Sequence, residues 1–143
     1  MSCNIPKSDK KRVVIVGGGF GGLKLAQKLK KSNYQVVLVD KNNYHQFPPL
    51  IYQVASSGIE PSSIAFPFRR IFQRRKDFYF RLASVLSIMP EEKIIQTSIG
   101  KLSYDYLVLA AGTTTNFFGN KDIEEESIPM KNLSESMGLR NAL

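Results

Sequence analysis

The chain has 143 residues, with 20 Lys or Arg against 12 Asp or Glu, a net charge of +8 at pH 7 and a hydrophobic content of 43%. This length predicts one domain that buries roughly two-thirds of the surface of its unfolded chain. Ordinary apolar content excludes a disordered chain, and the single cysteine, Cys3, excludes a disulfide framework. No apolar run approaches the ~20 residues of a membrane-spanning helix, and residues 1–10 lack a signal-peptide core.

Positive charge is concentrated in the first part of the chain. Residues 1–81 hold 15 basic and 4 acidic side chains, whereas residues 82–143 hold 5 and 8. Such asymmetry is typical of proteins that meet nucleic acid or an anionic membrane, but lysines such as Lys24 and Lys28 also fit the solvated face of a helix. No basic stretch carries the interleaved aromatic residues of a stacking platform, so we expect no nucleic-acid partner.

The first half of the chain has the pattern of a βαβ unit. Residues 1–11 read as a flexible lead, and residues 12–143 as the domain. The apolar run 13–16 is too short for a helix and predicts a buried strand, which the glycine-rich segment 17–22 follows. A helical pattern comes next, and then a second apolar strand that ends at Asp40.

The segments after Asp40 alternate between loops and helical patterns. Residues 42–47 read as a polar and aromatic loop, and residues 47–54 carry a helical stripe that Gly58 would end. Helical spacing continues from Pro61 to Phe72.

Strand patterns dominate the next part of the chain. Alternation predicts a strand from Phe78 to Leu82, and a turn at 90–93 leads to a return strand from Ile94 to Thr97. The last strand runs from Tyr106 to Ala111 and ends at Gly112. A capping pair, Asn132 and Glu135, predicts a final helix from Leu133, and we expect that helix to continue in a longer protein.

Three glycines and one acid form the first candidate site. Gly17 permits a tight turn out of the strand, Gly19 lets backbone approach a pyrophosphate, and Gly22 lets the helix pack on the sheet. The phosphates would lie at the helix N-terminus, where free N–H groups favour anions. Asp40 lies 18 residues after Gly22 and can accept hydrogen bonds from a ribose. The pattern predicts NAD or FAD and disfavours NADP, because an acid repels a 2′-phosphate.

The strand at 104–113 is the second candidate site. It is apolar and ends in the small residues Ala110, Ala111 and Gly112, which let a ligand lie against backbone.

These residues resemble a known family. The segment 13–22, Asp40 and the strand end at Gly112 are similar to the FAD domain of flavoproteins with two dinucleotide-binding domains. A sharper resemblance, to type II NADH:quinone oxidoreductases, lies in one stretch: Asn43-Tyr44-His45-Gln46-Phe47-Pro48-Pro49-Leu50-Ile51-Tyr52-Gln53-Val54-Ala55, with Gly58 and Pro61-Ser62-Ser63-Ile64 after it. Asn116-Phe117-Phe118-Gly119 and the helix from Asn132 to Leu143 resemble that family too. The implied fold is α/β, a Rossmann-like parallel sheet with an inserted β-meander.

The resemblance also implies which residues would hold FAD. The pyrophosphate would be wrapped by Gly17, Gly19, Phe20, Gly21 and Gly22, and the adenosine ribose would be held by Asp40 beside Lys41. Val85, in the strand from Phe78, would lie near the adenine. Pro49 and Leu50 would lie near the isoalloxazine ring, and Ala111, Gly112 and Thr113 near the ribityl and pyrophosphate groups. The family's usual strand end is Ala-Thr-Gly, so Ala111 removes one hydroxyl.

The implied activity is that of a non-pumping NADH dehydrogenase. It passes electrons from NADH through FAD to a membrane quinone, with no obligatory catalytic side chain and no metal. Because the NADH site of this family lies beyond the position of Leu143, we expect the isolated chain to be inactive. The resemblance implies a peripheral protein on the cytoplasmic face of the inner membrane, or a cytoplasmic one for this piece alone. The chain could form a homodimer, a question that the sequence leaves undecided. The basic cluster 69–76 is a candidate contact for anionic lipid.

Alternative interpretations concern both the acceptor and the class of protein. One alternative is another flavin reductase of the same superfamily with a soluble acceptor, and another is a non-catalytic dinucleotide-binding module. The single Cys3 cannot supply the redox cysteines of sulfide:quinone oxidoreductases. His45 is the only histidine, and either a proton role or a structural role fits it.

Overall fold

The computed structural model describes residues 3–142, which fall into two compact units. Unit 1 comprises Met1–His45 and Pro67–Gly112, and unit 2 comprises Gln46–Phe66 and Thr113–Leu143. The sequence predicts one domain over residues 12–143, and this stays a prediction; each unit is described by itself below.

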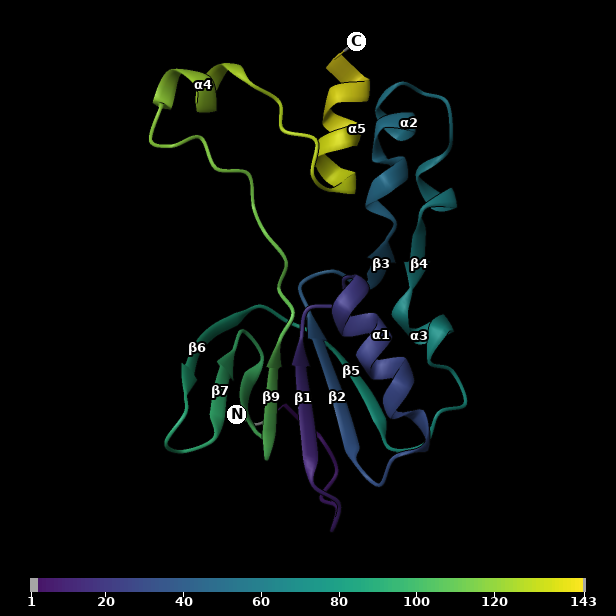
Figure 1. Ribbon diagram of the computed structural model, residues 1–143, viewed down its shortest axis with the longest axis vertical. Coiled ribbons are helices and arrows are strands. Elements are labelled where there is room, and N and C mark those ends of the chain that lie inside the picture. Colours follow the sequence, from purple (N-terminus) through teal and green to yellow (C-terminus); the bar gives the residue numbers. More distant parts are fainter. Residues whose placement is uncertain (1–2, 143) are drawn as a thin grey trace. The chain divides into compact units, whose positions relative to one another are not determined.

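A four-stranded parallel sheet forms the centre of unit 1 (Figure 1). Its order is β5 (Phe78–Leu82), β2 (Gln35–Asp40), β1 (Arg12–Val16) and β9 (Tyr106–Leu109). Parallel neighbours need a crossover connection, and α1 (Phe20–Lys28) supplies it between β1 and β2. These elements confirm the predicted βαβ unit and the α/β fold class.

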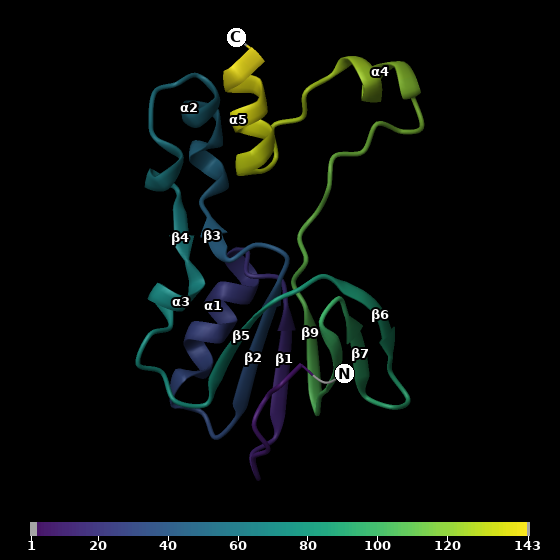
Figure 2. The ribbon, with the colours of Figure 1, turned by 180° about the vertical axis from the view of Figure 1, so that it is seen from behind.

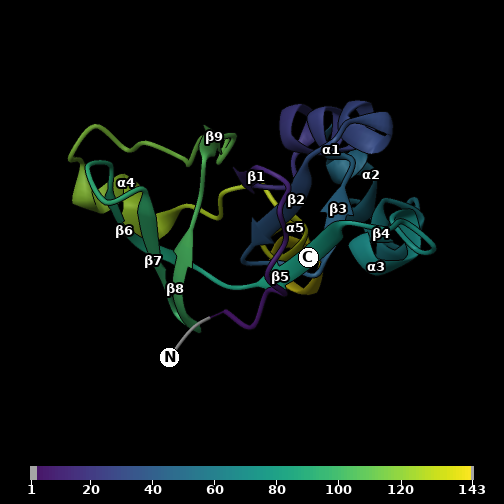
Figure 3. The same ribbon diagram turned by 90° about the horizontal axis from the view of Figure 1, so that it is seen from below.

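Successive side chains of a strand point to opposite faces, so each strand serves two cores. On one face, Val13 and Ile15 of β1 pack with Ala26 of α1 and with Phe68, the first residue of α3 (Phe68–Ile71). On the other face, Val14 packs with residues from a second sheet. Seen from below, α1 and that second sheet lie on different sides of β1 (Figure 3). This double coverage explains why the strands are almost continuously apolar.

The second sheet is an antiparallel meander of β6 (Val85–Met89), β7 (Ile94–Thr97) and β8 (Gly100–Ser103). It contributes Ile95 and Leu102 to the core behind the parallel sheet. The predicted turn at 90–93 and the predicted strand at 94–97 are confirmed. Sequence reasoning missed β8, and it placed the end of the last strand at Ala111, whereas β9 ends at Leu109.

The lead differs from the flexible segment that the sequence predicts. Cys3 is buried and its backbone N–H donates to the carbonyl of Lys101 at 3.2 Å. Arg81 donates from Nε to the carbonyl of Cys3 at 2.8 Å. Figure 2 shows this lead on the reverse side of the parallel sheet, near β7. The described part of the lead is thus fastened to unit 1, while Met1 and Ser2 lie outside the described residues.

Short elements make up the connection between β2 and β5. β3 (Tyr44–Gln46) and β4 (Ala65–Pro67) pair in a two-stranded sheet, and α2 (Ile51–Ala55) follows a 3-10 turn at Pro48–Leu50. The predicted loop at 42–47 therefore contains a strand. The predicted helical segment from Pro61 is broken by β4, because Pro67 removes a backbone donor. Helix α2 ends before Ser57, which takes the left-handed conformation (φ 60°) expected at Gly58.

Two helices complete unit 2. Helix α5 (Leu133–Ala142) begins as predicted: Asn132 accepts the N–H of Glu135 at 3.0 Å, and Glu135 accepts the N–H of Asn132 at 3.3 Å. This reciprocal pair is a capping box, which satisfies two otherwise unpaired donors. Helix α4 (Lys121–Glu126) was not predicted, although Asn120 caps it by accepting the N–H of Ile123 at 3.1 Å.

Candidate dinucleotide-binding site

The carboxyl ends of the parallel strands meet at one edge of the sheet in unit 1. The N–H of Gly17, after β1, donates to Val39 of β2 at 2.8 Å, and Ala110, after β9, donates to Val16 at 2.8 Å. Ala83, after β5, donates to the carbonyl of Asp40 at 2.9 Å. In open α/β sheets this edge is where ligands bind, so the segments that the sequence singled out converge on the expected place.

The glycine turn is shaped by close backbone contacts. Gly17 has a φ of +97°, and a Cβ on it would overlap the carbonyl oxygen of Ala110. A Cβ on Gly22 would overlap the carbonyl oxygen of Gly17. These contacts agree with the predicted steric roles: Gly17 makes the tight turn, and Gly22 lets α1 start directly against the strand end.

Gly18 is a residue that the sequence reasoning missed. Its N–H donates to Asp40 Oδ2 at 2.6 Å, its carbonyl lies 2.9 Å from His45 Nδ1, and a Cβ on it would overlap the buried ring of Phe68. The available signal was the unbroken run of three glycines, since the usual pattern leaves the middle position open.

The N-terminus of α1 is open to an anion. Its N-cap residue, Gly19, has no side chain that could cap the helix, and its first turn holds no acidic residue. A Cβ on Gly19 or Gly21 would meet no heavy atom within 4 Å, so neither residue is enclosed by its surroundings. Phe20, between them, is half-exposed. The helix dipole and the backbone donors of this turn favour a phosphate, and the residues present fit a dinucleotide pyrophosphate.

Asp40 is held by backbone donors on both carboxylate oxygens. Oδ2 accepts the N–H of Gly18 at 2.6 Å and Oδ1 accepts the N–H of Asn42 at 2.7 Å. Each carboxylate oxygen has a further lone pair, so the group can still accept ribose hydroxyls. Its neighbour Lys41 is exposed. The carboxylate therefore both braces the glycine turn and remains available to a ligand.

His45 is buried beside the glycine turn. Because Nδ1 faces a carbonyl oxygen, that of Gly18, Nδ1 must carry the hydrogen. The ring also packs edge-on against Phe20, with the ring centroids 5.4 Å apart. These contacts favour the structural role that the sequence left open beside a proton role.

The remaining predicted residues lie in different parts of the chain. Ala111 and Gly112 follow β9 at the same sheet edge, and Gly112 has a φ of +73°. The placement of Val85 in the strand from Phe78 is wrong, because β5 ends at Leu82 and Val85 begins β6. Ala83 and Ser84 form a break there, which lets the chain leave the parallel sheet for the meander.

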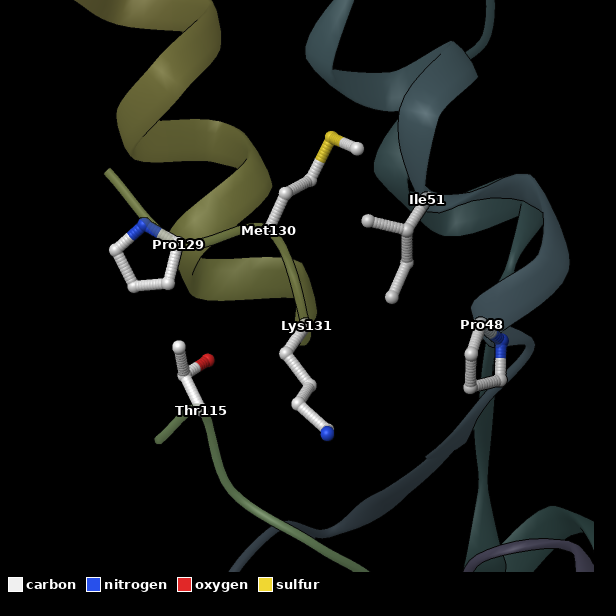
Figure 4. Close-up of a pocket in the computed structure, with 6 residues that line it drawn as sticks. All are labelled: Pro48, Ile51, Thr115, Pro129, Met130 and Lys131. Carbon is white, nitrogen blue, oxygen red and sulfur yellow. The ribbon is translucent and has the colours of Figure 1, made fainter. Parts of the chain in front are cut away.

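Three predicted residues belong to unit 2: Pro49, Leu50 and Thr113. The same unit holds a pocket of about 390 Å³, shown in Figure 4, which is lined by Pro48, Ile51, Thr115, Pro129, Met130 and Lys131. Pro48 and Ile51 face the other lining residues, and the Lys131 side chain extends between Thr115 and Pro48 (Figure 4). The pocket thus uses the neighbours of Pro49 and Leu50 rather than those two residues. Their role near a flavin stays a prediction.

The described residues contain neither a cluster of metal ligands nor a membrane-spanning helix. Among residues 3–142, no group of three or more His, Cys, Asp or Glu side chains is arranged to hold a metal ion. Within the same range, no helix combines the length and the apolar character needed to cross a bilayer.

Comparisons of sequence support the interpretation of this site. The family model described as pyridine nucleotide-disulphide oxidoreductase matches residues 11–142. The type II NADH:quinone oxidoreductase Ndh of Mycobacterium tuberculosis is 34% identical over 136 residues, covering 92% of this chain and 29% of the relative. The external alternative NAD(P)H-ubiquinone oxidoreductase B1 of Solanum tuberosum mitochondria is 32% identical, covering 98% of this chain and 26% of the relative. The chain thus spans less than a third of these relatives, and the predicted resemblance to type II enzymes is confirmed.

Solved structures share the fold of this chain. The sulfide:quinone oxidoreductase of Aquifex aeolicus matches with a TM-score of 0.84 and 27% identity, covering 92% of this chain and 31% of that one. NDH2 of Plasmodium falciparum, in complex with NADH, matches with a TM-score of 0.84 and 25% identity, covering 92% and 28%. With the glycine turn, Asp40 and this match over residues 11–142, the chain belongs to the pyridine nucleotide-disulphide oxidoreductase family.

Proposed function

We propose that this chain is the FAD-binding part of an oxidoreductase that passes electrons from NADH through FAD to a quinone. One observation carries the proposal: the open glycine turn at the N-terminus of α1 lies beside the fixed carboxylate of Asp40. The named activities of the similar proteins from Mycobacterium tuberculosis and Solanum tuberosum supply the donor and the acceptor.

The residues of unit 1 would bind the adenosine diphosphate half of FAD. The backbone of Gly19 and Gly21 would approach the pyrophosphate, while Asp40 would accept the ribose hydroxyls. Bound FAD supplies the two-electron redox chemistry, so the chain need provide no acid or base for the transfer. The role that we propose for this chain is to bind FAD and to orient it.

The place of action is part of the same proposal. A quinone dissolves in the bilayer, so we expect an enzyme that reduces it to contact the membrane surface from the cytoplasmic side. We propose peripheral association there, with or without a homodimer. The positive charge of residues 1–81 is consistent with an anionic surface.

A flavin titration tests the cofactor assignment. The purified chain should quench FAD fluorescence on binding, prefer FAD to NAD, and bind NADP least. Asp40→Ala should raise the Kd for FAD by about tenfold to a hundredfold, because a hydrogen bond to a charged group contributes about 1.5–3 kcal/mol. Asp9→Ala, which removes an exposed acid of the lead, is the matched control and should leave the Kd unchanged.

Two other outcomes would favour the alternatives. Binding of NAD without binding of FAD would indicate a non-catalytic dinucleotide-binding module. A yellow polypeptide of the relatives' length that oxidises NADH with a soluble dye but with no quinone analogue would indicate a reductase with a soluble acceptor.

A further inference from the structure

A second concave site lies in unit 1, at the sheet edge opposite the glycine turn. Strands β1, β2 and β5 begin there, and the pocket of about 280 Å³ is lined by residues that lie just before them, Lys10, Tyr34 and Asp77. Each of these strands has five or six residues, so at about 3.3 Å per residue the two edges are roughly 16–20 Å apart. The second site is therefore separate from the candidate dinucleotide site.

Cationic side chains dominate the lining of this basic pocket, which is formed by Lys10, Leu29, Lys30, Lys31, Ser32, Tyr34, Arg74, Arg75, Lys76 and Asp77. The cations come from three segments: the lead, the connection between α1 and β2, and the connection between α3 and β5. The one acid of the lining, Asp77, is already paired with Lys10 at 2.7 Å.

Most of the remaining positive charge is uncompensated. Lys30, Lys31, Arg74 and Lys76 are exposed, and within residues 3–142 none of them forms a salt bridge. Like charges that share a small concave surface repel each other, and a multivalent anion relieves that repulsion most effectively. The pocket therefore favours a ligand with several negative charges.

Arg75 is a fixed donor at this site. Its Nη1 donates to the carbonyl of Ala26, and its guanidinium carbon lies 5.0 Å from the ring centroid of Phe78 and 5.8 Å from that of Phe72. Its Nε is buried and has no hydrogen-bond partner among the described residues. Burial lowers the pKa of Arg75, because desolvation disfavours the charged guanidinium. A nearby anion would offset this desolvation.

We propose that the basic pocket binds a ligand that carries two or more phosphate groups. Guanidinium and ammonium groups are the side chains that recognise phosphate oxygens, and here they converge from three segments on one concave surface. A free polyphosphate compound and the headgroup of a phosphorylated lipid offer the same chemistry. The two sources are separated by the choice of probe.

Inorganic tripolyphosphate is the first probe. Titration calorimetry on the purified chain, at about 150 mM salt, should show binding to the wild type. The pocket variant Lys30→Gln/Lys31→Gln/Arg74→Gln should bind about tenfold more weakly. The control variant Lys24→Gln/Lys28→Gln/Arg69→Gln removes the same charge from exposed positions outside the lining, so its affinity should change less than about threefold.

Phosphatidylcholine vesicles with and without cardiolipin, a lipid with two phosphates, are the second probe. A loss confined to the pocket variant supports the proposal, and the probe that shows it identifies the source of the phosphates. Equal losses in both variants, or no binding of either probe, would overturn the proposal. FAD affinity, measured in parallel, should be the same in both variants, so failure of this site is distinguished from failure of the flavin assignment.

Discussion

Gly18 and Gly19 are adjacent glycines with different surroundings. A Cβ on Gly18 would overlap the buried ring of Phe68, whereas a Cβ on Gly19 would meet nothing within 4 Å apart from its chain neighbours. The first residue is therefore constrained by the core of the protein, and the second faces the space in which a ligand would lie. Of these two neighbouring glycines, Gly18 therefore serves the stability of the fold, and Gly19 serves ligand binding.

Alanine substitutions should separate these two roles. Gly18→Ala should lower the free energy of unfolding by about 1–3 kcal/mol, because its methyl group overpacks the contact with Phe68. Gly19→Ala should lower that free energy by no more than about 1 kcal/mol but should weaken FAD binding about tenfold. Urea denaturation and FAD fluorescence measure the two effects. Equal losses of stability in both variants would contradict the described packing.

His45 connects β3 to the glycine turn through one hydrogen bond. His45→Ala leaves the Gly18 carbonyl without this donor, and we expect a loss of about 1–2 kcal/mol in the free energy of unfolding. His45→Asn keeps an N–H near the position of Nδ1 and should recover part of that loss. If alanine and asparagine are equally destabilising, ring packing against Phe20 rather than the hydrogen bond holds this contact.

At the scale of elements, the capping box of α5 joins the two residues that the sequence predicted as a capping pair. Asn132→Ala should destabilise α5 by about 1 kcal/mol, because the N–H of Glu135 loses its acceptor. Asn132→Asp should preserve the cap, and Ser134→Ala, at an exposed position in the same turn, is the matched control. Hydrogen exchange of the α5 amides measures the effect. Faster exchange in the Ser134→Ala variant as well would indicate fraying unrelated to the cap.

Elements that follow from local patterns were predicted well, and those that depend on distant partners were not. The runs that became β1 and β2, and the cap at Asn132, each carry their own signal. By contrast, β3 and β4 are three residues long and exist because they pair with each other. The same holds for β8, whose residues 100–103 have little strand character until β7 pairs with them.

The candidate site follows the same division. The glycine pattern and Asp40 are visible because each residue meets a local steric or charge requirement. The roles of Gly18 and His45 depend on Phe68 and on each other, across 27 residues between Gly18 and His45. A contact between residues so far apart in the sequence cannot be predicted from the local pattern of apolar and polar residues.

At the scale of the whole molecule, Cys3, the first described residue, contacts segments almost a hundred residues away in the sequence. Cys3 Sγ lies 3.3 Å from Thr97 Oγ1 and 3.3 Å from the carbonyl oxygen of Gly100. Cys3 is only 4% exposed and belongs to the core between the parallel sheet and the meander. The lead therefore belongs to the folded structure of unit 1, and its stability should follow that of the unit.

The reactivity of the Cys3 thiol tests this arrangement. In the native protein the thiol should react with Ellman's reagent about a hundredfold more slowly than in denaturant, because reaction requires the lead to open. Arg81→Leu, which removes the donor to the Cys3 carbonyl, should accelerate the reaction without unfolding the parallel sheet. A Ser8→Cys substitution in a Cys3→Ala background places the thiol at an exposed position of the same lead and should react at the denatured rate. Equal native rates for the two thiols would show that the lead is free, as the sequence alone predicts.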